Sequence, residues 1–364
     1  MRYAPPLCAL MLATLTACGN DVRSPEGGAE AGVEAGLEAP AMTAPGSGGP
    51  LGAVPVPDEN PLSEGKIALG HQLFFDSRLS VDGSRSCYSC HQNENGNGGA
   101  DPTAVGAANR QLTRHSPVIW NVAYMPRFYW DGRSGSLEAQ VKGAWGGGNM
   151  GVGSENLDAK AAELGGIPGY AEQFAELFGD RGATAETIAE AIASYERTLV
   201  CDDTRYDQFV AGEAGSLSEE EHRGMEIFNG KAACATCHTP PFFSAQFGTD
   251  QGLYYNVGIG IEGRSEGDVD VGRQAVTKAE EDWAAFKVPS LRNITESAPY
   301  FHDGSVASLP AAVRYMAGSG VANRNLTPLI TDRGLTDPEV GAIVAFLGAL
   351  TCPADLVEPE LPGS

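Results

Sequence analysis

Basic residues are scarce in this chain, which has 24 Lys and Arg against 47 Asp and Glu among its 364 residues. The formal net charge of -23 argues against nucleic acid and anionic membrane surfaces as partners. Two interpretations of the charge stay open: it keeps the protein soluble, or it forms an acidic face that attracts a basic protein.

The N-terminal segment lacks an apolar run of membrane-spanning length, since residues 7–15 form only a short one. Leu15-Thr16-Ala17 then precedes Cys18, which predicts a signal peptide over residues 1–17. Cys18 after small residues resembles a bacterial lipobox and predicts a diacylated lipoprotein, with an ordinary secretory signal as the alternative. Asn20, where Asp would favour inner-membrane retention, favours an outer-membrane anchor. Both alternatives predict export to the periplasm.

Large apolar residues are nearly absent from residues 18–57, which are rich in Ala, Gly, Glu and Pro. Such a composition cannot bury a core and predicts a lipidated flexible linker. We expect an N-terminal domain over 58–205, a C-terminal domain over 206–355 and a disordered Pro-rich tail over 356–364.

Two cysteine motifs stand out, Cys87-Tyr88-Ser89-Cys90-His91 and Cys234-Ala235-Thr236-Cys237-His238. Cys-x-x-Cys-His is the attachment signature of c-type haem, in which the thiols form thioethers and the His binds the iron. A zinc site or a redox dithiol would need a further ligand cluster or a thioredoxin-like βαβ unit, and the sequence shows neither. We therefore predict two covalently bound c-type haems, with His91 and His238 as iron ligands.

Two cysteines remain beyond the signal, the predicted anchor and the haem motifs: Cys201 and Cys352. Each follows an apolar helical run, and an oxidising compartment favours a disulfide between them. Two buried free thiols are the alternative, because the sequence does not show their separation.

Helical periodicity of apolar residues predicts a mainly α protein. The Ser218/Glu221 pair forms a predicted capping box. We expect His71 and His222, on two of these helices, to lie at the surface. The principal expected helices cover residues 63–75, 136–141, 169–178, 184–200, 218–228, 309–316 and 337–350.

A weak internal repeat precedes the haem motifs. Gly70-x-x-Leu73-Phe74 before the first motif corresponds to Gly224-x-x-Ile227-Phe228 before the second. This repeat suggests a duplicated haem module.

Several further segments combine with the two haem motifs into a recognisable set. The set comprises residues 74–80 (FFDSRLS), 130–133 (WDGR), 286–293 (FKVPSLRN) and 298–302 (APYFH). It resembles the bacterial dihaem cytochrome c peroxidase / MauG family from about residue 58 to residue 350. The resemblance implies two cytochrome c-like haem domains in tandem and an enzyme that reduces hydrogen peroxide. It also implies that electrons pass from the C-terminal to the N-terminal haem.

The sixth iron ligands follow from the resemblance. Met316, fourteen residues after His302, takes the position of the family's Met ligand to the C-terminal haem. Tyr315 is its competitor, and a core role for Met316 is the other alternative. Ala107 stands where conventional members carry a distal His, so the N-terminal haem is expected to be open, as in MauG-like members.

The resemblance also assigns peroxide-handling groups. Gln140 matches the family's distal Gln, whereas Asn149 takes the place of its Glu and cannot exchange a proton. Glu155 is the nearest downstream acid and could substitute only if the glycine loop folds back. Trp130 matches a tryptophan that relays electrons between the haems, with simple packing as the alternative.

An interdomain calcium ion is the remaining feature that the resemblance implies. His115 takes the family's Asn position, and Ser297 and Pro299 supply the expected carbonyl ligands. Imidazole is a poor ligand for this hard cation, so calcium is a weak expectation. His115 as a ligand to the first iron is the less favoured alternative.

Three functions remain open at this stage. The first is peroxide reduction with a small redox protein, a cytochrome c or a cupredoxin, as electron donor. The second is MauG-like oxidation of Trp or Tyr in a partner protein, and the third, motivated by Asn149, is a non-catalytic electron-transfer lipoprotein. We expect no nucleic-acid partner, membrane contact by the lipid anchor only, and a homodimer on family grounds.

Overall fold

The computed structural model describes residues 51–246 and 252–363. The predicted signal peptide, Cys18 and nearly all of the linker lie outside these residues. In the described residues no helix is long and apolar enough to cross a membrane. The described helices are α1 (Glu64–Phe75), α2 (Leu137–Gly146), α3 (Leu157–Gly165), α4 (Pro168–Phe178), α5 (Ala185–Glu196), α6 (Arg205–Val210), α7 (Glu219–Asn229), α8 (Gln274–Thr277), α9 (Leu309–Met316) and α10 (Asp337–Gly348).

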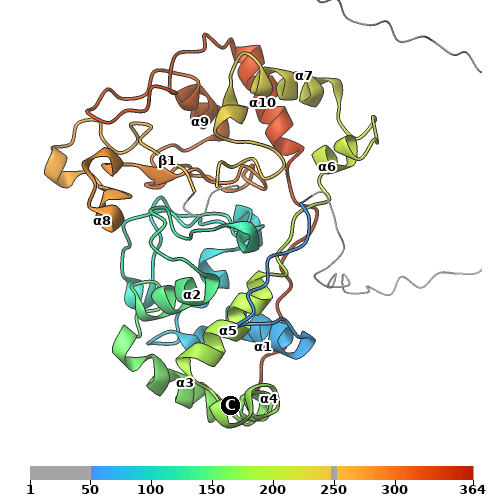
Figure 1. Ribbon diagram of the computed structural model, residues 1–364, viewed down its shortest axis with the longest axis vertical. Coiled ribbons are helices and arrows are strands. Elements are labelled where there is room, and N and C mark those ends of the chain that lie inside the picture. The colour runs from blue at the N-terminus through green and yellow to red at the C-terminus, as the bar shows by residue number, and fades with distance from the viewer. Residues whose placement is uncertain (1–50, 247–251, 364) are drawn as a thin grey trace, which may run out of the picture. The chain divides into compact units, whose positions relative to one another are not determined.

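The mainly α prediction is confirmed, since strand structure is slight (Figure 1). Strands β1 (Tyr254–Tyr255) and β2 (Phe286–Lys287) pair antiparallel and form a two-stranded sheet. Short 3-10 turns cover part of each haem motif, at Tyr88–Cys90 and Cys234–Thr236. These turns bring the two cysteines of each motif to one side of the chain.

The first helical pair, α1 and α5, meets at a glycine. A Cβ on Gly70 would lie 1.9 Å from the carbonyl oxygen of Ala191, so only glycine permits this approach. Leu69 and Leu73 of α1 are fully buried in the core that the two helices share. Tyr88 stacks on Phe75 with ring centroids 4.6 Å apart, which ties the first haem motif to α1.

The second helical pair, α7 and α10, repeats this arrangement. A Cβ on Gly224 would lie 1.9 Å from the carbonyl oxygen of Ala342. Phe228 and Phe346 pack with ring centroids 5.3 Å apart in a second core. The two glycines of the internal repeat thus occupy equivalent helix crossings, which supports a duplicated haem module.

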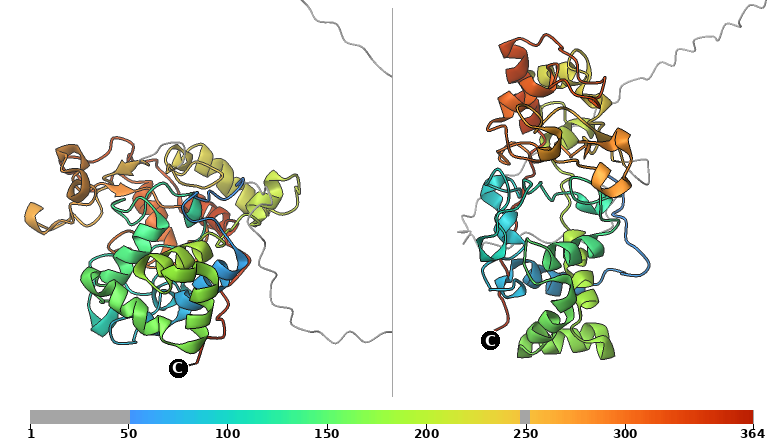
Figure 2. Two further views of the ribbon diagram at one scale, coloured as in Figure 1. Left: turned by 60° about the horizontal axis from the view of Figure 1, so that its bottom comes forward. Right: turned by 90° about the vertical axis from the view of Figure 1, so that its left-hand side faces the viewer.

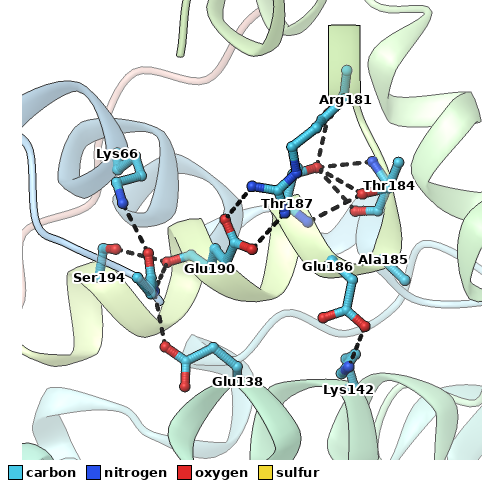
Figure 3. Close-up of polar contacts among 12 residues, drawn as sticks. Lys66, Glu138, Lys142, Arg181, Thr184, Ala185, Glu186, Thr187, Glu190 and Ser194 are labelled. Atoms are coloured by element: carbon cyan, nitrogen blue, oxygen red, sulfur yellow. Dashed lines mark hydrogen bonds and ion pairs between the residues drawn. The ribbon is translucent and has the colours of Figure 1, made fainter. Parts of the chain in front are cut away.

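Helix α5 is held by polar contacts along its length (Figure 3). It begins with a capping box between Thr184 and Thr187. Arg181 forms an ion pair with Glu190, and Ser194 donates to the carbonyl of Glu190 at 2.7 Å. These contacts stabilise the helix, whose last residue is Glu196.

Helix ends differ from the prediction at two places. Helix α2 continues past residue 141 to Gly146, because Val141 and Trp145 both pack into the core. Helix α5 ends at Glu196 and not at residue 200. Thr198 Oγ1 donates to the carbonyl of Tyr195 at 2.7 Å, which closes the last turn.

Two cross-links join segments that are distant in the sequence. The predicted disulfide between Cys201 and Cys352 is present, and it connects positions 151 residues apart. Arg114 forms ion pairs with Asp270 and Asp131, each at 2.7 Å. The disulfide and the Arg114–Asp270 ion pair run between the N-terminal and C-terminal haem modules, whereas the Arg114–Asp131 pair lies within the N-terminal module.

The prediction of a disordered C-terminal tail is wrong for residues 356–363. Leu356 is buried in the core of the N-terminal module, and its N–H donates to Asn93 Oδ1 at 2.9 Å. Arg78 donates to the carbonyl of Pro362 at 2.9 Å. The last segment therefore runs back beside the N-terminal helices (Figure 2).

Candidate haem site

A cavity of about 520 Å³ contains both motif histidines in its wall. Its lining comes from the N-terminal module around His91 and from the C-terminal module around His238, and it is mostly apolar. Trp130 and Met316, two of the predicted functional residues, also line it. The structure thus brings both predicted haem sites to one connected space.

The hydrogen bonding and burial of His91 suit it to bind iron through Nε2. Its Nδ1 lies 3.2 Å from the carbonyl oxygen of Asn97, and the carbonyl of Pro117 is also within hydrogen-bonding reach. Burial lowers the pKa of His91 to about 4, so the ring is neutral. When the Nδ1–H of His91 donates a hydrogen bond to a carbonyl, Nε2 carries no proton, and its lone pair is available to bind iron.

His238 repeats this environment in the second module. Its Nδ1 lies 3.0 Å from the carbonyl oxygen of Phe243, with the carbonyl of Pro289 within reach. Burial lowers the pKa of this ring also to about 4. The two motifs therefore present equivalent neutral imidazoles.

The thiols complete the fit to haem. Cys87, Cys90, Cys234 and Cys237 are free, and the only disulfide among the described residues is formed by two other cysteines. Burial raises the pKa of Cys87 far above its usual range and that of Cys234 to about 11, so both thiols are neutral. Paired thiols, neutral imidazoles and an apolar wall suit two thioether-bound macrocycles.

Met316 and Tyr315 differ in their surroundings. Met316, the last residue of α9, lines the cavity with His238. Tyr315 is not among the cavity-lining residues, and its hydroxyl donates to the carbonyl of Val257 at 3.0 Å. The geometry favours the thioether over the phenol as sixth ligand.

Trp130 is held by backbone contacts from both modules. Its indole Nε1 donates to the carbonyl of His115 at 2.8 Å, and its own carbonyl accepts the N–H of Lys287 at 2.8 Å. His302 lies edge to face with the indole and stacks on Phe286, with centroids 3.6 Å apart. These rings form a continuous aromatic group in the cavity wall.

Of the predicted peroxide-handling residues, Gln140 lines the cavity, whereas Asn149 and Glu155 do not. Gln140 of α2 lines the cavity, and its carbonyl accepts the hydroxyl of Tyr129 at 2.8 Å. Asn149 is not among the cavity-lining residues; its carbonyl accepts the N–H of Ala107 at 2.9 Å. Glu155 is exposed and likewise outside the cavity wall.

The three predicted calcium ligands lie together, but their arrangement does not fit a hard cation. His115, Ser297 and Pro299 all line the cavity. The imidazole of His115 has its Nδ1 2.9 Å from the carbonyl oxygen of Asp101, and the carbonyl of Ser297 is also within its reach. One of the two candidate carbonyl ligands, that of Ser297, therefore faces an imidazole nitrogen. No group of three or more His, Cys, Asp or Glu able to hold a metal occurs in the described part of the chain.

Two charged residues in the cavity wall were missed by sequence reasoning. Lys287 is a cation whose pKa burial lowers to about 8, and Glu196 is a carboxylic acid at the end of α5. Glu196 follows Ile188 and Ile192 at helical spacing. A carboxylate on the apolar stripe of that helix was the available signal.

Comparison with known proteins identifies the family to which the chain belongs. The model of the family described as di-haem cytochrome c peroxidase matches residues 64–215. The cytochrome-c peroxidase IdrP1 of Denitromonas iodatirespirans is 37% identical over 339 residues, which cover 86% of this chain and 89% of that protein. The chain belongs to the di-haem cytochrome c peroxidase family. It is a peroxidase-type oxidoreductase with two c-type haems.

Further relatives of this dihaem peroxidase include MauG proteins. The methylamine utilization protein MauG of Methylorubrum extorquens is 33% identical and covers 85% of each chain. A solved MauG-like protein associated with microbial copper homeostasis aligns with a TM-score of 0.75 and 29% identity, over 89% of this chain and 97% of that one. These likenesses confirm the tandem haem domains.

Proposed function

We propose that the protein reduces hydrogen peroxide at the N-terminal haem with electrons that enter at the C-terminal haem. The supporting observation is the connected cavity, in whose wall His91, His238 and Trp130 all lie. When bound, the two haems supply the one-electron redox chemistry and the iron that activates peroxide. The chain supplies the ligands, the electron path and the proton-transfer groups.

Met316 and Trp130 have separate roles in this proposal. With haem bound, Met316 would supply a thioether ligand to the C-terminal iron and raise its reduction potential, which suits an electron-accepting site. Trp130 and His302 bridge the modules. The electron donor is a small redox protein, a cytochrome c or a cupredoxin, attracted by the acidic surface.

Lys287 has a role in holding the cofactor. A lysine buried without a carboxylate contact is costly in an apolar wall. Its Nζ contacts Met125 Sδ at 3.9 Å. We assign it to a haem propionate, whose negative charge would restore the lysine pKa.

A MauG-like activity is the second candidate. Ala107 is buried and has no group that can bind iron, so this position would leave the iron of a bound N-terminal haem open to peroxide. The likeness to MauG over 85% of the chain favours the same idea. In this variant the oxidising equivalents pass to a Trp or Tyr of a partner protein.

The proposal also covers the cellular location, the membrane anchor and the oligomeric state of the protein. The protein is exported to the periplasm and anchored by lipidated Cys18, and it forms a homodimer. Calcium at His115, Ser297 and Pro299 is not part of this proposal, because the His115 ring already faces the Ser297 carbonyl, and no step of the proposed reaction depends on it. Metal analysis, mass spectrometry of the mature N-terminus and sedimentation test these points.

Stopped-flow absorbance tests the proposed function. The fully oxidised dihaem protein is mixed with stoichiometric hydrogen peroxide, without prior reduction. A rapid Soret change with peroxide consumed supports an open N-terminal haem with peroxidase chemistry. No reaction, persisting after the C-terminal haem is reduced, would overturn the proposal and leave an electron carrier.

A further inference from the structure

The loop after α2 brings no carboxylic acid into the cavity wall, but helix α5 does. Asn149 cannot exchange a proton and Glu155 is exposed, so neither predicted position provides proton transfer to peroxide. Among the described residues that line the cavity, Glu196 is the only one with a carboxyl group. It comes from α5, far along the chain from the loop where an acid was sought.

The carboxyl group of Glu196 has an unused hydrogen-bonding position. The residue is 7% exposed, and its Oε2 is buried without a hydrogen-bond partner in the described residues. An unpartnered buried carboxyl oxygen is costly in a structural role, because it loses hydration without compensation. A substrate or a water molecule in the cavity would satisfy it.

Arg197, the residue after Glu196, forms its ion pair with Glu138 and not with Glu196. Arg197 Nη1 pairs with Glu138 Oε1 at 2.7 Å, and Asn60 donates to the same Glu138 atom at 2.8 Å. Glu138 lies on α2 and is not in the cavity wall. One acid therefore binds the available cation, and Glu196 is left to exchange its proton.

Other groups face Glu196 from each packed element. They are Tyr195 and Arg197 on its own helix and its continuation, Glu138 on α2, Tyr129 in the loop before α2, and Cys87 of the haem motif. Burial is the main cause of the raised pKa of Cys87, Tyr129 and Tyr195, and the charge of Glu196 raises each of them further. Cys87 stops titrating once it is a thioether, and the two phenols stay protonated, so Glu196 is the group that changes charge near neutral pH.

We propose that Glu196 is the proton-transfer residue of peroxide reduction, in partnership with Gln140. Its carboxylate accepts the proton from one peroxide oxygen and returns it to the other, which leaves as water when the O–O bond breaks. The complete reaction converts one hydrogen peroxide, two protons and two electrons into two water molecules. The electrons come through the haems from the donor protein, and the protons from solvent. Gln140 orients the peroxide by hydrogen bonding.

This inference rests on the proposed peroxidase function, so its test needs a reporter that is not turnover. Cyanide is suitable, because HCN must give its proton to a base when cyanide binds a ferric haem. The variants are Glu196→Gln and, as matched control, Glu155→Gln. Equal haem content and unchanged spectra of the C-terminal haem show that both variants fold.

The expected results separate the two variants. Glu196→Gln slows cyanide binding at the N-terminal haem and the peroxide reaction by roughly 10²–10⁴-fold, the usual contribution of a general acid–base group. It also removes the rise of both rates with pH that the wild type shows as Glu196 ionises. Glu155→Gln behaves as the wild type.

Two outcomes are decisive. If Glu196→Gln keeps the wild-type rates and pH profile for cyanide and peroxide, the assignment of Glu196 is wrong. If the wild type fails with peroxide but Glu196 still controls cyanide binding, the proposed peroxidase function fails and the proton-accepting role of Glu196 stands.

Discussion

The indole of Trp130 and the imidazole of His302 meet edge to face, with ring centroids 6.4 Å apart. Trp130 belongs to the N-terminal module and His302 to the C-terminal one. The contact is reinforced by the N–H of His115, which donates to the carbonyl of His302 at 2.7 Å. An aromatic path between the two haem modules is therefore held by backbone hydrogen bonds.

The first prediction concerns this path. Trp130→Phe keeps an aromatic ring but loses the oxidisable indole and its hydrogen bond to the His115 carbonyl. Electron transfer from the C-terminal to the N-terminal haem should slow by at least ~10-fold, equivalent to about 1.4 kcal/mol in the barrier. Flash reduction of the C-terminal haem measures this rate.

Trp145→Phe is the matched control for Trp130. Trp145 is equally an indole with a backbone partner, the carbonyl of Leu79 at 2.9 Å, but it is not among the cavity-lining residues. Its replacement should leave the electron-transfer rate unchanged. Equal rates in the wild type and Trp130→Phe would remove the relay from the mechanism.

The second prediction separates the two candidate ligands of the C-terminal haem. Met316→Ala should convert this haem from low-spin to high-spin and lower its reduction potential, because the thioether ligand is lost. Tyr315→Phe removes only the hydroxyl that donates to Val257, and the spectrum should stay low-spin. Optical and paramagnetic resonance spectra of the two variants decide between them; a high-spin Tyr315→Phe protein would reverse the assignment.

The third prediction tests the repeated helix crossing. Gly70→Ala places a methyl group against the carbonyl of Ala191 and should lower the free energy of unfolding by about 1–3 kcal/mol. Gly341→Ala, in α10, meets open space and should raise it by roughly 0.5–1 kcal/mol. Denaturant unfolding measures both, and a stabilised Gly70→Ala protein would contradict the close helix contact.

The fourth prediction concerns the pH dependence of stability. Burial raises the pKa of Glu196 from 4.5 to about 8, and the partial negative charge at the C-terminal end of α5 acts in the same direction. The folded protein thus binds this proton more tightly than the unfolded chain. The stability that Glu196 contributes is complete below pH about 4.5 and is lost as the pH rises to about 8.

Glu196→Gln should therefore gain stability relative to the wild type as the pH rises from 5 to 9, by up to a few kcal/mol. Glu138→Gln should instead lower the free energy of unfolding by a constant amount from pH 5 to 9, because Glu138 is ionised in both the folded and the unfolded chain there. Burial alone would raise the pKa of Glu138, but the hydrogen bonds from Arg197 and Asn60 lower it overall, so its contribution to stability is lost only as the pH falls below about 4.5. Unfolding free energies from about pH 3 to 9 test both variants, and parallel curves for Glu196→Gln and the wild type would refute a raised pKa of Glu196.

Local signals in the sequence were sufficient for much of this structure. The Cys-x-x-Cys-His motifs indicated the haem sites, and the glycines at 70 and 224 marked equivalent helix crossings. The disulfide was anticipated because two cysteines remained after the motifs were assigned. Each of these features depends on residue types that few other environments use.

Features set by tertiary packing were missed. Glu196 has no sequence signal beyond its place on the apolar stripe of the helix predicted over 184–200, because its entry into the cavity wall depends on how that helix packs. Helix α2 runs past residue 141 because Trp145 is drawn into the core, which outweighs the poor helix propensity of nearby glycines. The order of residues 356–363 depends on partners more than 260 positions earlier in the chain, such as Asn93.

The returning tail changes how the modules can be separated. Leu356 fills part of the core around α1, and His71 Nε2 lies 2.6 Å from the carbonyl oxygen of Val357. A fragment ending at residue 205 would lack this covering segment and expose apolar surface to solvent. The two haem modules are therefore expected to fold only within one polypeptide, because the segment that covers the N-terminal module is encoded after the C-terminal one.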